Sequence, residues 1–259
     1  MLEFDPGPPQ SVAAHLMAVP SYAAHRELFW YDWGPVFYRG RLDGSAKLLC
    51  IASDPGPTER IAGRTLVGDA GQRVQGFLNK VGLSHSYVLV NAFAYALLPS
   101  KAHKGTAILS EDAHLTWRNA LLDMIVGPSL QAVVAFGGQA QAAVQLWQDR
   151  PDVPLVEVAH PSSRHEPELV AGWHAAIDTL RSVVTPDDGA DPSLPNYVGK
   201  VLESDYARIP VRDLPFGVPP WLGDDHAGRT GKPKRRNCAD RPSDDLLHTL
   251  VWQAPADQP

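Results

Sequence analysis

Residues 47–56 read KLLCIASDPG, a short apolar run that ends in polar and turn-forming residues. The run has the length of a buried strand. Because its apolar residues fall on both faces, it is typical of a parallel sheet that is covered on both sides. Three further runs of this kind lie at Tyr87–Asn91, Ala132–Phe136 and 155–159. The sequence therefore predicts a central sheet of four parallel strands.

Helical patterns separate these runs. In residues 69–81, apolar side chains recur at the i, i+3, i+4 and i+7 positions of one helical face, and Gly82 follows as a stop signal. Further helical patterns begin at Ser110, after the Gly137-Gly138 pair and at Glu166. Strands and helices that alternate at this spacing predict an α/β fold, a three-layer α/β/α sandwich with right-handed crossovers around the four-stranded parallel sheet.

Two flanks differ in character from this core, which is expected to span residues 47–185. Residues 1–46 carry a helical stretch and the aromatic cluster FWYDWGPVFY, a composition that favours packing against the sandwich. Residues 186–259 are rich in Pro, Gly and Asp, which predicts an extended wrap or a partly disordered tail. Within that tail, residues 226–241 hold six basic residues and one acidic residue.

Composition excludes several classes of protein. The chain has 259 residues, 44% of them hydrophobic, which is enough to bury a substantial core. A formal charge of -6 argues against binding nucleic acid or anionic membrane by bulk charge, although it does not exclude a local basic groove. The two cysteines, Cys50 and Cys238, exclude a disulfide framework and a four-thiolate iron–sulfur or zinc site. With no signal-peptide pattern and no long apolar run, a soluble cytoplasmic protein is expected, with no membrane partner.

The loops at the carboxyl ends of the strands are the places to look for a site, because ligands gather there in parallel α/β sheets. The first strand runs into Asp54-Pro55-Gly56 and then the stretch GRTLVGDAG at residues 63–71, and the fourth runs into His160-Pro161-Ser162. With Asn91 at the end of the second strand, this combination resembles the uracil-DNA glycosylase superfamily over roughly residues 47–169. The nearest branch is the one written P-G-x-x-E and G-R-x-x-V-G-x-A-G.

The resemblance implies a monofunctional DNA glycosylase. Such an enzyme flips a uracil or a 5-modified pyrimidine out of DNA and hydrolyses its N-glycosidic bond, which leaves an abasic site for base excision repair. Bond cleavage puts positive charge on the sugar and negative charge on the base, so a carboxylate and a hydrogen-bond donor are wanted. By resemblance, Asp54 is the carboxylate and His160 stabilises the departing base. The alternatives are a turn-forming Asp-Pro and a helix-start histidine.

The base-contacting positions follow from the same resemblance. Asn91 would read the pyrimidine edge with its amide, unless it only caps a strand end, and the backbone of Ser53 would meet the base carbonyl. Gly56 and Leu66 stand where related enzymes place aromatic residues, so the pocket is expected to admit 5-modified pyrimidines, unless Leu66 is an ordinary packing residue. Phe93 or Tyr95, in the loop after the second strand, would supply the missing stacking surface.

DNA is the expected partner. Ser162 and Ser163 are suited to phosphate contacts, and Arg164 stands where the family wedges a residue into the duplex, although a solvated loop is the alternative. The basic stretch in the tail is either a solvated arm or a grip on the DNA backbone.

No cofactor is expected, and neither a metal nor an iron–sulfur cluster. The iron–sulfur branch of the family needs four cysteines, and His160, His165 and His174 are spaced too loosely for a recognisable metal site. A monomer is expected. Two alternative roles remain, namely excision of modified bases from phage DNA as a defence enzyme, or a catalytically silent module that binds damaged or single-stranded DNA.

Overall fold

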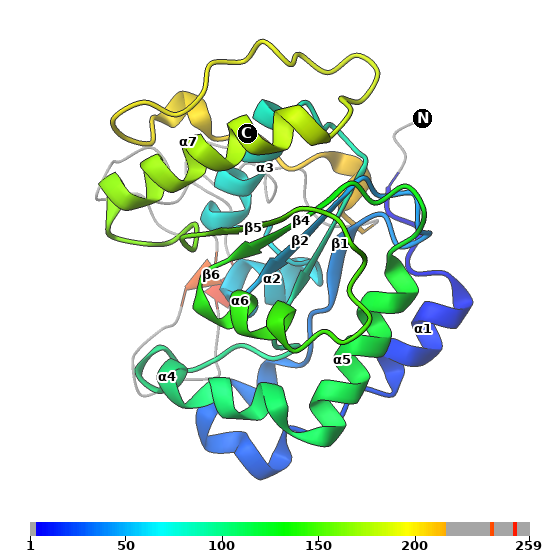
Figure 1. Cartoon of the computed structure of the whole chain (residues 1–259). Helices are drawn as coiled ribbons and strands as arrows, with labels where there is room; N and C mark the ends of the chain where they lie inside the picture. The colour runs from blue at the N-terminus through cyan, green and yellow to red at the C-terminus, as the bar shows by residue number, and fades with distance from the viewer. Residues whose placement is uncertain (1–3, 216–238, 241–250, 253–259) are drawn as a thin grey trace.

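The computed structural model describes residues 4–215, 239–240 and 251–252. Its main sheet has the strand order β1-β3-β2-β4-β5 (Figure 1). The strands β2 (Leu48–Ala52), β3 (Tyr87–Asn91), β4 (Ala132–Phe136) and β5 (Leu155–Val158) are parallel, as predicted. The α/β sandwich is thus confirmed. The sheet gains a fifth strand, β1 (Tyr38–Gly40), which pairs antiparallel with β3 and which the sequence does not predict because it is short and lies within the aromatic flank.

Helices cover both faces of the sheet. They are α1 (Gln10–Met17), α2 (Pro57–Ala62), α3 (Asp69–Val81), α4 (Ala102–Gly105), α5 (Asp112–Ile125), α6 (Gly138–Gln145) and α7 (Glu166–Val183). One hydrophobic cluster joins the sheet to α3 and α7, and a second joins it to α1, α5 and α6. A short pair of strands, β6 (Ala239–Asp240) and β7 (Val251–Trp252), forms a separate sheet.

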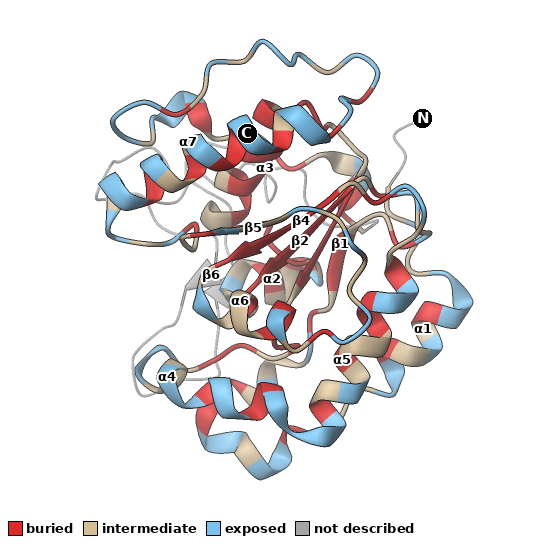
Figure 2. Cartoon of the chain, viewed as in Figure 1, coloured by how far each residue is buried: buried red, intermediate tan, exposed pale blue. Residues whose placement is uncertain are grey.

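The strand β2 shows why both faces must be covered. Its residues are all buried (Figure 2). Leu48 and Cys50 pack into the cluster with α3 and α7, whereas Leu49 packs into the cluster with α1, α5 and α6. Because side chains alternate across a strand, an uninterrupted apolar run leaves no face for water. No helix in the described ranges is long and apolar enough to cross a membrane.

Residues 186–215 pack on the core through buried polar groups. The fully buried Arg39 of β1 donates a hydrogen bond to the Gln75 side chain (2.9 Å) and forms an ion pair with Asp213 (3.2 Å). The hydroxyl of Tyr87 donates to the same Asp213 carboxylate (2.8 Å). Burial raises the pKa of Asp213, and the nearby Arg39 charge opposes this effect. The start of the C-terminal extension is therefore fixed to β1, β3 and α3.

Asp187 fixes the beginning of the same segment. One of its carboxylate oxygens accepts hydrogen bonds from the backbone N–H groups of Ser84, His85 and Ser86, and the other pairs with the Lys47 ammonium at 3.1 Å. Burial alone would raise the pKa of Asp187, but the hydrogen bonds from Ser86, His85 and Lys47 hold it well below its usual range. Asp187 thus links the extension to the turn that leads into β3.

Candidate active site

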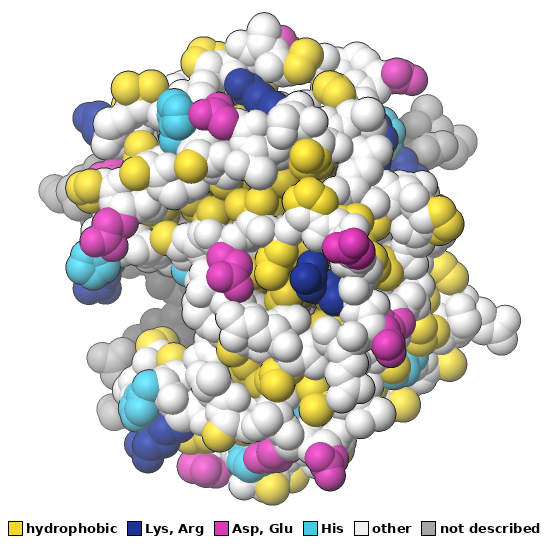
Figure 3. All heavy atoms as spheres, viewed as in Figure 1, with side chains coloured by type: hydrophobic (Ala, Val, Ile, Leu, Met, Phe, Trp, Pro, Cys, Tyr) yellow, Lys and Arg dark blue, Asp and Glu magenta, His cyan; other side chains and the backbone are white. Residues whose placement is uncertain are grey.

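Four strand ends meet at one edge of the sheet. Asn91 ends β3 and lies opposite Ala52 of β2, while Asp54 follows β2 and His160 follows β5. Since β4 lies between β2 and β5, its end brings Gly137 into the same row. Figure 3 shows the molecule hollowed on the left, between the start of α7 and α4, where the parallel strands of Figure 1 point. The structure therefore brings the two predicted catalytic residues to one edge.

Asp54 is a partly buried carboxylate held by the neighbouring loop. Its Oδ2 accepts a hydrogen bond from the backbone N–H of Leu97 (2.8 Å). Burial raises its pKa to about 6, the hydrogen bonds from Ser53 and Leu97 lower it, and the nearby Glu59 charge raises it slightly. At neutral pH the group is mostly ionised, yet it lies close enough to titration to accept a proton.

His160 is set up as a neutral donor. Its Nδ1 accepts a hydrogen bond from the backbone N–H of Ser162 (3.2 Å), so the proton of the neutral ring lies on Nε2. Burial lowers its pKa to about 4, which keeps the ring uncharged at physiological pH. A Cβ atom on Gly137, whose φ is +85°, would lie only 2.9 Å from the Cβ of His160. The turn after β4 therefore needs glycine at position 137, because a side chain there would collide with His160.

Glu59 organises the loop that carries Asp54. Its Oε1 accepts hydrogen bonds from the backbone N–H groups of Val67 (2.9 Å) and Gly68 (3.0 Å), and its Oε2 accepts one from Gly56 (3.1 Å). A Cβ atom on Gly56 would come within 2.7 Å of Oε2. Close packing against Glu59 is therefore a structural reason for glycine at this position, besides the wider base pocket expected from the sequence.

Asn91 is oriented by Thr65. Its amide Nδ2 donates to the hydroxyl oxygen of the fully buried Thr65, while its Oδ1 is buried and has no hydrogen-bond partner among the described residues. The backbone of Thr65 is itself held by a hydrogen bond from its N–H to the Tyr38 carbonyl (3.1 Å). The amide of Asn91 therefore keeps a buried acceptor at the end of β3 that no described residue uses.

Two residues predicted to contact the base present almost no accessible surface. Phe93 is 1% exposed and packs against Phe29, with ring centroids 5.8 Å apart. Leu66 is 6% exposed, belongs to the core cluster and has a left-handed backbone with φ +52°. In this conformation neither offers a face on which a base could stack. Leu66 is therefore placed as an ordinary packing residue, which was the alternative interpretation. Of the two aromatic residues considered for stacking, Phe93 is buried and Tyr95 is partly exposed.

Ser53 extends the pairing of β2 and β3. Its carbonyl accepts a hydrogen bond from the N–H of Phe93 (3.0 Å).

The residues predicted to touch DNA lie on the turn between β5 and α7. Ser162 and Arg164 are exposed, and Ser163 is half-buried with its hydroxyl accepting the N–H of His165 (3.2 Å). The sequence did not predict that a side chain of α3 would hold this turn in place. Arg73 of α3 donates to the carbonyl of Pro161 (3.0 Å) and to the hydroxyl of Tyr206 (2.6 Å). No sequence signal marks Arg73, because it reads as one polar position on an amphipathic helix.

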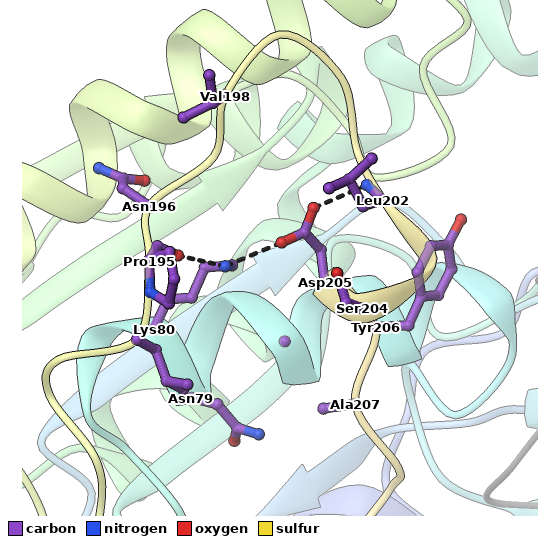
Figure 4. Close-up of a pocket in the computed structure, with 12 residues that line it drawn as sticks. Asn79, Lys80, Pro195, Asn196, Val198, Leu202, Ser204, Asp205, Tyr206 and Ala207 are labelled. Atoms are coloured by element: carbon purple, nitrogen blue, oxygen red, sulfur yellow. Dashed lines mark hydrogen bonds and ion pairs between the residues drawn. The ribbon is translucent and has the colours of Figure 1, made fainter.

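A cavity of about 540 Å³ lies between α3 and the segment 194–207 (Figure 4). Its charged groups are already paired, since the Lys80 ammonium contacts Asp205 at 2.9 Å and donates to the Pro195 carbonyl. We assign it no ligand. Of the described residues, one group of three could hold a metal ion, namely His25 of the N-terminal flank with Glu111 and His114 at the start of α5. The basic stretch of residues 226–241 lies outside the residues whose side chains the structure describes.

Comparison with known proteins identifies the family. The family model of the uracil DNA glycosylase superfamily matches residues 39–172, which is more than half of the chain. The match contains β2 to β5 and every predicted site residue from Ser53 to Arg164. A search among curated proteins finds no significant match. The sandwich, the motifs at its strand ends and the family match agree, and the chain belongs to the uracil DNA glycosylase superfamily.

Proposed function

We propose that the protein is a monofunctional DNA glycosylase that releases uracil, or a 5-substituted uracil, from DNA. One observation carries this proposal, namely that the same sheet edge holds a carboxylate, Asp54, and a neutral histidine, His160, whose proton lies on Nε2. These are the two groups that N-glycosidic hydrolysis needs, an anion near the sugar and a donor near the base. DNA is accordingly the proposed partner, and a monomeric cytoplasmic enzyme stays a prediction.

The reaction can be written with these groups. The bond between C1′ and the base nitrogen breaks, and its electron pair goes to the base. The Nε2–H of His160 donates a hydrogen bond to the base oxygen on which negative charge develops, and His160 itself remains neutral. The Asp54 carboxylate stabilises the cationic sugar and accepts a proton from the water that attacks C1′. A pKa of about 6 suits a group that must be ionised first and protonated afterwards.

Asn91 supports the choice of base. The hydrogen bond to Thr65 uses one of the two N–H groups of the Asn91 amide and fixes its orientation, and the buried acceptor Oδ1 has no partner among the described residues. The ring N3 of uracil and of its 5-substituted derivatives carries a proton and can donate to this acceptor. The N3 of cytosine is an acceptor and would face the oxygen with no hydrogen between them, which costs about 1–3 kcal/mol for the unpaired groups. This arrangement favours uracil-type bases over cytosine.

A panel of modified duplexes tests the proposal. Duplexes with uracil, thymine, 5-hydroxymethyluracil, cytosine or a modified cytosine are incubated with the full chain. Alkali treatment then cuts the strand wherever base release has left an abasic site. We expect release of uracil-type bases, and a loss of turnover of about a hundredfold or more in Asp54→Asn with DNA binding retained. Asp149→Asn, at an exposed position, is the matched control and should behave as the wild type.

Two results would count against the proposal. Undiminished cleavage by Asp54→Asn would remove Asp54 from the chemistry. Binding without release from every duplex would identify the silent DNA-binding module instead. Release of modified but not plain uracil would favour the defence role against modified phage DNA over repair of deaminated cytosine.

A further inference from the structure

We propose that His25, Glu111 and His114 form a binding site for a zinc-class divalent metal ion between the N-terminal flank and the start of α5. His25 lies in the 3-10 helix η1 (Ala23–Leu28), Glu111 immediately precedes α5, and His114 lies in the first turn of α5. The site would join two segments that are far apart in the sequence. The argument for this site does not rest on the proposed glycosylase function.

The geometry brings three ligand atoms together. One ring nitrogen from each histidine and one oxygen of Glu111 all lie within 4.8 Å of one another, and His25 Nε2 is 2.9 Å from Glu111 Oε2. In a tetrahedral zinc site, with bonds of about 2.0–2.2 Å, ligand atoms lie about 3.4 Å apart. Small side-chain rotations would therefore bring the three atoms to coordination distance.

His114 supplies the second, independent observation. The residue is only 6% exposed, and its Nδ1 is buried with no hydrogen-bond partner in the part of the chain that the structure describes. An ordinary surface ion pair accounts for His25 and Glu111, but it does not account for a buried, unpartnered imidazole beside them.

The ligand types and their exposure decide the class of ion. Two imidazoles and one carboxylate favour zinc and its transition-metal neighbours over magnesium and calcium, which prefer sites made of oxygen. The side chains of His25 and Glu111 are 24% and 44% exposed, so an ion can enter from solvent. Three protein ligands leave the fourth position to water.

A bound ion would stabilise the loop that follows Asn91. The ring of His114 packs edge-on against Tyr22 (centroids 4.5 Å apart), and Tyr22 contacts Tyr95 at 4.7 Å. The Tyr22 hydroxyl also accepts the backbone N–H of Ala94 (3.3 Å). Ala94 and Tyr95 belong to the segment whose Leu97 N–H binds Asp54. The ion would thus hold the N-terminal flank against this segment.

Titration of the full chain with zinc chloride tests the site. After treatment with a chelator and its removal, binding is measured by calorimetry and by the melting temperature. We expect one zinc ion per chain and a rise in melting temperature, because the ion binds the folded state. His25→Ala and Glu111→Gln should each weaken binding at least tenfold. His103→Ala, an exposed histidine outside the cluster, should leave it unchanged.

Substitution by cobalt gives a second readout that needs no variant. A tetrahedral cobalt ion with nitrogen and oxygen ligands absorbs visible light much more strongly than the hexaaqua ion, and stoichiometric zinc should abolish this absorption. No binding by the wild type, binding unaffected by His25→Ala and Glu111→Gln, or equal displacement of cobalt by magnesium chloride would each overturn the proposal.

Discussion

At Asp54, burial and hydrogen bonding act on the same carboxyl group in opposite directions, and burial prevails. The pKa rises to about 6, whereas that of His160 falls to about 4. Above about pH 6, Asp54 is ionised and His160 is neutral. These are the protonation states that the proposed reaction uses. The two pKa values shift in opposite directions because burial disfavours the charged form of both groups, an anion in Asp54 and a cation in His160.

The pH dependence of base release follows from these two groups. We expect kcat/KM to rise about tenfold per pH unit up to about pH 6, where Asp54 becomes ionised, and then to level off. His160 should add no falling limb near neutrality, because it is neutral above about pH 4. Initial rates on a uracil duplex between pH 4.5 and 9 measure the profile. A rate that rises below pH 5 and is level across pH 6 would contradict the assignment.

The same shift has a consequence for stability. Because the folded-state pKa of Asp54 is raised above its unfolded value, the ionised group destabilises the fold at high pH, and this effect disappears below about pH 4. Asp54→Asn should therefore raise the melting temperature at pH 8 and not at pH 4. Thermal unfolding of both proteins at the two pH values checks this, with Asp149→Asn as the control.

Thr65 is expected to set the choice of base through Asn91. In Thr65→Val the hydroxyl acceptor is removed, so the Asn91 amide is free to turn its Nδ2 toward the base. The ratio of uracil to cytosine release should then fall by about tenfold, which corresponds to about 1.4 kcal/mol. Thr65→Ser keeps the hydroxyl and should keep the ratio. An unchanged ratio in Thr65→Val would show that other contacts orient the amide.

At the scale of elements, the turn from β4 into α6 fixes the position of His160, because Gly137 in this turn lies directly against it. Gly137→Ala would place a Cβ atom 2.9 Å from His160 and require a left-handed backbone, so His160 must shift. We expect the rate of base release to drop at least tenfold while DNA affinity changes little. Gly138→Ala, next in sequence and with open space around it, is the matched control. Equal rates for both variants would remove this constraint from the site.

Strands are the elements that the sequence predicts best. The parallel strands could be predicted because a run such as residues 48–52 is apolar on both faces, which is the pattern of a strand buried on both sides. The edge strand β1 could not, since three residues within an aromatic stretch carry no periodicity. Motif positions likewise predicted that Asp54 and His160 share one edge. They could not predict the burial of Phe93 and Leu66, which depends on the packing of the aromatic flank and the core.

At the scale of the whole molecule, contacts distant in sequence were the hardest to foresee. His25 and Glu111 are 86 residues apart, and neither lies in a motif with metal-ligand spacing. The same holds for Arg39 and Asp213, which are separated by 174 residues. Only the folded chain brings such residues together, so composition and spacing carry no signal for them.

The whole-chain charge of -6 makes the basic stretch of the tail worth testing. If residues 226–241 grip the DNA backbone, removing residues 224–259 should weaken DNA binding and reduce the slope of log K against log salt. The slope should fall by about 0.9 for each phosphate that the truncated chain no longer neutralises. Fluorescence anisotropy at several salt concentrations measures both quantities. An unchanged slope would identify the stretch as a solvated arm.

The hydrogen bonds from Arg73 to the Pro161 carbonyl and to the Tyr206 hydroxyl can form only after Tyr206 has been synthesised. Asp54, Asn91 and His160 all leave the ribosome before Tyr206 and Asp213 do, since domains emerge from their N-terminal end. A nascent chain that ends after α7 already carries every proposed catalytic group, yet it lacks the hydroxyl that steadies Arg73 and the carboxylate that neutralises Arg39. We therefore expect the proposed activity to arise late in translation, when the C-terminal extension packs across α3.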